Sequence, residues 1–175
     1  MIRLTAFCAL LSTMLFPMLV LAQVLGGNPN FPVLNEIQWE MKASEIQSLC
    51  ANRWKETSNT DSAMVYSASF FGTSARVKIQ VDPNSKMPRM IDIAFEQPTS
   101  AMRDTLVSRF TQTTGKAPFI TTKEKSAIIF TIKLEMAIWK TGNETVSVMT
   151  AMRGSSIVAL SIILAPTGVA QKGKS

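Results

Sequence analysis

Cys50 and Arg53 are the residues whose types and spacing come closest to catalytic chemistry. They lie three positions apart in SEIQSLCANRW, so a helix would place them on one side, where an arginine favours the reactive thiolate. A thiol nucleophile also needs a general base, and the chain contains no histidine. This absence removes Ser-His and Cys-His pairs and the usual zinc and iron ligand sets. A Cys50-dependent enzyme or redox protein is therefore kept only as an alternative.

The apolar pattern around Cys50 favours a packing role. Ile46, Leu49, Cys50 and Trp54 fall at i, i+3, i+4 and i+8, so a helix capped by Ser44 would place all four in one apolar stripe. Free cysteine is among the most buried residue types. We therefore predict that Cys50 fills space in the core.

Other chemical motifs are missing or incomplete. The loop Asp82-Pro-Asn84-Ser-Lys86 begins like a calcium loop but has lysine where a third oxygen ligand should be, which favours a plain turn. The chain has no Ser-x-x-Lys motif and no glycine-rich phosphate loop. We predict a protein that is not an enzyme, with no catalytic residue, no metal site and no cofactor.

The first twenty-two residues have the pattern of a secretory signal peptide: Arg3, an apolar stretch and a Val20-Leu21-Ala22 end. We predict cleavage before Gln23 and export to the periplasm or the extracellular space. An uncleaved transmembrane anchor is the alternative. Cleavage would remove Cys8, so Cys50 would have no partner for an internal disulfide.

The net charge of the chain indicates which classes of partner it favours. Without Arg3, seventeen Lys and Arg face twelve Asp and Glu, a net charge of about +5. This excess favours an acidic protein partner, or weak contact with an anionic envelope surface. The basic residues form no run and alternate with acids, which argues against nucleic acid as a partner.

The composition divides the chain into a loop-rich arm at 23–38, one α/β domain at 39–166 and a flexible basic tail at 167–175. A second helix should begin after Pro98 and end at Gly115. Strands are predicted at 62–71, 75–82, 89–96, 119–122, 127–140, 144–152 and 156–164.

The two predicted helices resemble each other. SEIQSLCANRW is followed 56 residues later by SAMRDTLVSRF, in which Leu106 takes the place of Cys50. This internal similarity suggests tandem α-βββ repeats over 39–97 and 98–166. We predict an α+β fold, a two-layer sandwich with both helices on one face of an antiparallel sheet and the other face open.

The lead into the first helix, IQWEMKASEIQSL at 37–49, resembles the Trp-x-Met-x-x-Ser/Thr-x-x-aliphatic opening of small secreted bacterial α/β modules. These include the β-lactamase-inhibitor-like repeats and the small outer-membrane assembly lipoproteins. The resemblance implies binding without catalysis, often through the open sheet face.

Candidate partner-binding residues follow from the expected phase of the strands. On 127–140, Trp139 shares a side with Lys133, opposite a more apolar side that we assign to the core. A bulge that turns Trp139 inward is the alternative. The predicted binding residues on the open face are Arg76, Lys78, Lys133, Trp139, Met149 and Arg153.

We therefore expect a secreted or periplasmic, non-catalytic protein-binding module, such as an inhibitor, an immunity protein or an envelope accessory factor. A peripheral binder of anionic lipid or cell-wall polymer is the second alternative.

Overall fold

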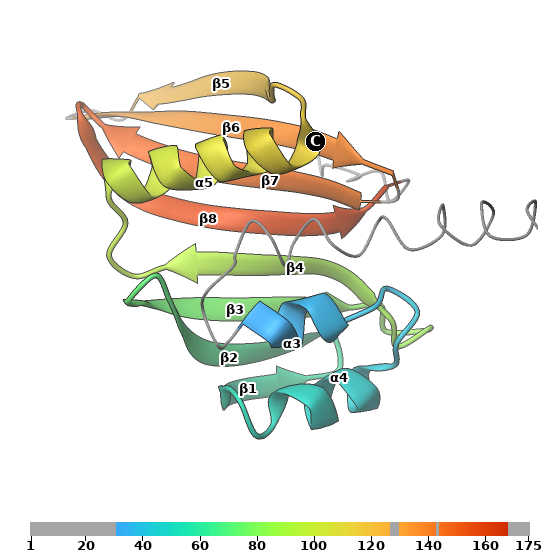
Figure 1. Ribbon diagram of the computed structural model, residues 1–175. Helices are drawn as coiled ribbons and strands as arrows, with labels where there is room; N and C mark the ends of the chain where they lie inside the picture. The colour runs from blue at the N-terminus through green and yellow to red at the C-terminus, as the bar shows by residue number, and fades with distance from the viewer. Residues whose placement is uncertain (1–30, 127–129, 143, 168–175) are drawn as a thin grey trace, which may run out of the picture.

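The computed structural model describes residues 31–126, 130–142 and 144–167, and the strands of this part form one antiparallel sheet (Figure 1). The sheet has eight strands in the order β1-β2-β3-β4-β8-β7-β6-β5. The strands are β1 (Lys55–Thr60), β2 (Ala63–Phe70), β3 (Thr73–Val81), β4 (Pro88–Phe95), β5 (Phe119–Ser126), β6 (Thr131–Thr141), β7 (Glu144–Arg153) and β8 (Ser156–Pro166). The helices are α3 (Phe31–Glu36), α4 (Ala43–Cys50) and α5 (Ser100–Thr114).

The expected antiparallel sheet is confirmed, but the predicted α+β two-layer sandwich is wrong. The chain is mainly β. Its described helices have 6, 8 and 15 residues and are too short to form a complete second layer over eight strands. The α-βββ repeat is also wrong: the first unit has four strands after α4 where three were predicted, and the four strands predicted after the second helix are present after α5.

The sheet consists of two meanders, β1–β4 and β5–β8, that meet through their last strands. β4 pairs with β8 in the centre, with Ile91 opposite Leu164 and Ile93 opposite Ile162. A further link comes from Trp39, before α4, whose Nε1 donates a hydrogen bond to Glu144 Oε1 on β7 at 2.8 Å. The N-terminal segment is thereby tied to the second meander.

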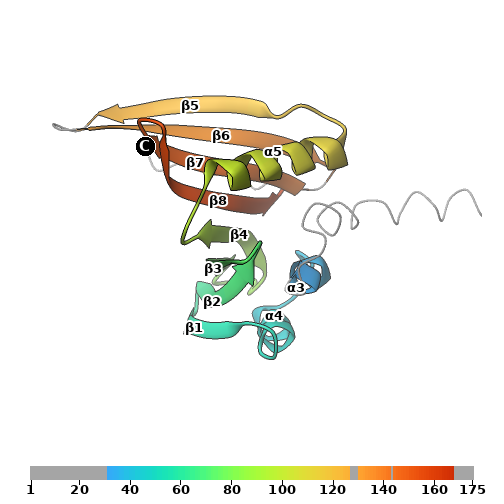
Figure 2. The ribbon, with the colours of Figure 1, turned by 60° about the vertical axis from the view of Figure 1, so that its left-hand side comes forward.

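All three helices lie on one face of the sheet (Figures 1 and 2). Directly opposed residues of paired antiparallel strands share a face, so the register traces this covered face across the sheet. α5 contributes Leu106 and Phe110 to the core, and α4 contributes Ile46 and Cys50. One buried row of the covered face runs through Tyr66, Val77, Ile93, Ile162, Val148 and Ala137.

Local signals set the ends of the longer helix as predicted. The Thr99 side chain accepts a hydrogen bond from the Met102 N–H at 3.1 Å, and Gly115 ends α5 in the left-handed conformation with φ 63°. The N-terminus of α4 differs from the prediction. Lys42 occupies the cap, because its N–H donates to Glu45 Oε2 at 2.6 Å, and Ser44 lies inside the helix.

The predicted N-terminal arm is not wholly loop. Its residues 31–36 form α3, which buries Val33 and Leu34 against the core. The predicted signal peptide, the first part of the arm and residues 168–175 of the predicted tail lie outside the described residues. No described helix has the length and apolar character needed to cross a membrane.

Candidate functional site

The side of the sheet opposite the helices is the candidate site, and we call it the open face. Its apolar part lies on β6, β7 and β8 and is half-buried instead of fully solvated. It is made of Ile132, Leu134, Met136, Ile138, Met149, Ala151 and Ile163.

The orientation of β6 determines this surface. Trp139 is 2% exposed and packs against Phe110 of α5, with ring centroids 5.4 Å apart. Arg103 of α5 donates a hydrogen bond to Glu135 on the same side of β6. No register shift interrupts the pairing of β6 with β7. The prediction that Trp139 lies on the open face is therefore wrong, and no bulge is the cause.

Lys133 belongs to the same side of β6 as Trp139, so its predicted place on the open face is wrong too. It lies opposite Met152 on β7 and Glu124 on β5, and it is exposed. The more apolar side of β6, which we assigned to the core, faces away from the helices. The helix α5 supplies partners for the less apolar side: a ring for Trp139 and a guanidinium for Glu135.

The other four predicted residues do lie on the open face. Met149 is opposite Met136 on β6 and Ser161 on β8, in the middle of the apolar part. Arg153 lies at the end of β7, with its Cζ 5.0 Å from the centroid of the Phe130 ring. Arg76 and Lys78 lie on β3, in the other meander. Met149 and Arg153 thus share one strand, and Arg76 lies in the same cross-strand row as Met149, through Ala94 on β4 and Ser161 on β8.

Among the described strand residues, the register places one acidic side chain on the open face, that of Asp92. It lies between Lys78 on β3 and Ile163 on β8. Its Oδ1 is buried and has no hydrogen-bond partner among the described residues. Burial raises the pKa of this carboxyl, while the positive charges of Arg76 and Lys78 act in the opposite direction. The open face therefore holds a carboxyl that is poorly solvated in the absence of a partner.

The thiol of Cys50 lies far from this surface, on the covered face. It is 0% exposed, and burial raises its pKa to about 12, against the opposing effects of the Tyr66 hydrogen bond and of Arg53. Arg53 itself forms an ion pair with Glu36 of α3, at 2.7 Å between Nη1 and Oε1. At neutral pH the thiol is protonated and enclosed, as a core residue would be.

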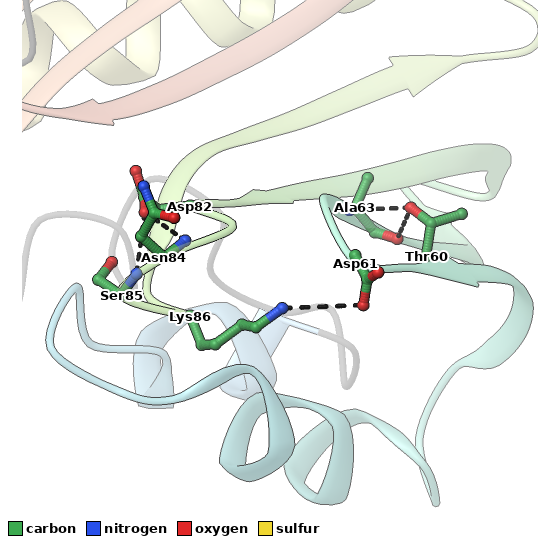
Figure 3. A network of polar contacts seen from close by, with 7 residues as sticks. All are labelled: Thr60, Asp61, Ala63, Asp82, Asn84, Ser85 and Lys86. Atoms are coloured by element: carbon green, nitrogen blue, oxygen red, sulfur yellow. Dashed lines mark hydrogen bonds and ion pairs between the residues drawn. The ribbon is translucent and has the colours of Figure 1, made fainter.

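The loop after β3 is a hydrogen-bonded turn (Figure 3). Asp82 Oδ1 accepts hydrogen bonds from the N–H groups of Asn84 and Ser85, both at 2.9 Å, and these bonds lower the pKa of Asp82. Lys86 Nζ lies 3.7 Å from Asp61 Oδ1 on the turn between β1 and β2. Within the described ranges, no group of three or more Cys, Asp or Glu side chains could hold a metal ion.

Sequence reasoning missed the outward apolar residues of β6, such as Leu134 and Met136. The signal that could have found them is the hairpin register. The short turn after Thr141 places Trp139 opposite Val146, and opposed residues share a face. Met149 was placed on the open face, and Val146, three residues before it on the same strand, lies on the other side. Trp139 therefore had to lie on the covered face with Val146. Comparison with protein-family models, with curated proteins and with solved structures finds no match to this chain.

Proposed function

We propose that this chain is an exported, non-catalytic binding module whose open face contacts an acidic protein partner. The observation that carries the proposal is the apolar surface on the uncovered side of β6, β7 and β8. An antiparallel sheet with one face in water usually has polar residues there. A contiguous apolar surface on that side is typical of a contact site.

The residues of this surface suit protein contact. Met136 and Met149 lie directly opposite each other across β6 and β7, and Leu134 and Ile163 extend the surface on either side. Methionine side chains are flexible and polarizable, so they adapt to the shape of a partner. A patch of this kind, enclosed by charged residues, matches the apolar core and polar rim of protein interfaces.

The charges around the patch favour an acidic partner. Arg76 and Lys78 lie toward one side, on β3, and Arg153 lies at the end of β7. On the edge strand β5, Lys123 and Lys125 share the open face, because they lie opposite Leu134 and Ile132. Positive groups on several sides of an apolar patch steer an acidic surface toward it.

Photo-cross-linking in the native host tests this proposal. A benzophenone side chain replaces Met149 on the open face, and a matched variant carries it at Asn59, an exposed residue of the edge strand β1. We expect an adduct with an acidic protein from position 149 and not from position 59.

Two outcomes of this experiment would overturn the proposal. Equal adducts from both positions would show unspecific contact, and an absence of protein adducts from position 149 would show that no protein covers the open face. Adducts with lipid alone would instead support contact with a membrane surface.

A further inference from the structure

A hollow of about 610 Å³ lies at the outer edge of the sheet, where the loop after α5 meets the ends of β5 and β6. Ligand pockets in proteins usually have volumes of about 300–1,000 Å³. The lining residues are Lys116, Ala117, Phe119, Ile138, Trp139 and Lys140. The hollow is therefore large enough for a small organic molecule.

The walls of the hollow are mostly apolar. Phe119 begins the edge strand and is 70% exposed, and Ile138 lies directly opposite it on β6. Trp139 is held in place by its packing against Phe110. The exposed ring of Phe119 lies beside Ile138 on the same face of the sheet, and the two side chains offer a contact for an apolar group.

The charged groups of the hollow have one sign. Lys116 and Lys140 both line it, and no acidic residue does. Among the described residues, no carboxylate lies within ion-pair distance of either ammonium group. A ligand with a single anionic head would be attracted by the two cationic side chains of the lining while its apolar part contacts the ring of Phe119.

We propose that this hollow is a binding site for a small amphiphile with one anionic head, of the class of medium-chain carboxylates. Charge complementarity selects the head, and the apolar walls select the chain. The hollow borders the apolar patch of β6, β7 and β8 at Ile138, but Lys116, Ala117 and Phe119 line the hollow and are not part of the patch. Substitutions at these residues therefore test the hollow without changing the patch that carries the proposed function.

Calorimetric titration of the folded protein with octanoate tests this site, with octanol and octylammonium as matched ligands. We expect octanoate to bind at least tenfold more tightly than either of them. The double substitution Lys116→Glu and Lys140→Glu should weaken octanoate binding at least tenfold. The charge-matched control, Lys123→Glu with Lys125→Glu, should change it less than twofold, because neither of these lysines lines the hollow.

A third variant distinguishes binding inside the hollow from general attraction to the charged surface. Ala117→Trp keeps the charge and fills the space, so it should abolish octanoate binding while the melting temperature stays near that of the wild type. The proposal is overturned if octanoate binds no more tightly than octanol, if the two double variants behave alike, or if Ala117→Trp binds as the wild type does.

Discussion

Cys50 has a side chain that could react, but its role in this fold is structural. Its neighbour Arg53 could have favoured the thiolate, but it forms an ion pair with Glu36. The thiol is enclosed among Ile46, Trp54 and Tyr66, and burial raises its pKa to about 12. The periodicity of the helix predicted this burial, because it placed Cys50 in the middle of an apolar stripe.

We expect Cys50 to react with a maleimide far more slowly in the native protein than in urea, because the thiol is enclosed and protonated at neutral pH. Labelling followed by mass spectrometry at pH 7 measures the two rates. Native labelling as fast as that of an unfolded thiol would show that Cys50 is accessible. It would then support the alternative of a Cys50-dependent enzyme or redox protein.

Asp92 should lower the free energy of unfolding at neutral pH. Burial raises the pKa of its carboxyl above the ordinary value of 3.8, so between these two pKa values the folded state binds more protons than the unfolded state. Stability therefore falls as the pH rises through the folded pKa, and below 3.8 the cost disappears. The nearby Arg76 and Lys78 offset only part of this cost.

Substitution of Asp92 by asparagine should thus stabilise the free protein at pH 7 and have little effect near pH 3. Urea unfolding of both proteins at the two pH values checks this expectation. A variant that is less stable than the wild type at pH 7 would show that the charge is well solvated or paired in the folded state.

The strands and helices differ in how well their sequences predicted them. Strong alternation predicted β3 and β4, and a Pro98 start with a Gly115 stop predicted α5. β1 was missed because its six residues, KETSNT, are all exposed and carry no apolar pattern. For β6 the element was predicted but its sides were exchanged, because both sides contain apolar residues; the register of the β6–β7 hairpin and the contact with α5 distinguish them.

The contact of β6 with α5 makes Trp139 a stabilising residue. Trp139→Ala should lower the free energy of unfolding by about 3–5 kcal/mol, since a large ring is removed from the core. Phe119→Ala is the matched aromatic control and should cost less than about 1 kcal/mol, because that ring is 70% exposed. Equal costs in urea unfolding would contradict the orientation of β6.

For the whole molecule, the sequence predicted the antiparallel sheet and showed the similarity between the two helix segments. The width of the sheet and the pairing of β4 with β8 could not, because that pair joins strands from different meanders that no short turn connects. Of the predicted binding residues, those on β3 and β7 lie on the open face, as expected, and Lys133 and Trp139 on β6 lie on the opposite side. The proposed contact site is the apolar part of the open face.

The affinity for the protein cross-linked from position 149 tests this claim most directly. Calorimetry would compare the wild type with Met149→Glu, on the open face, and with Asn59→Glu, the charge-matched control on β1. We predict at least a tenfold loss for Met149→Glu, about 1.4 kcal/mol, and less than a twofold change for Asn59→Glu. Unchanged binding of a folded Met149→Glu protein, or equal losses in both variants, would contradict the account.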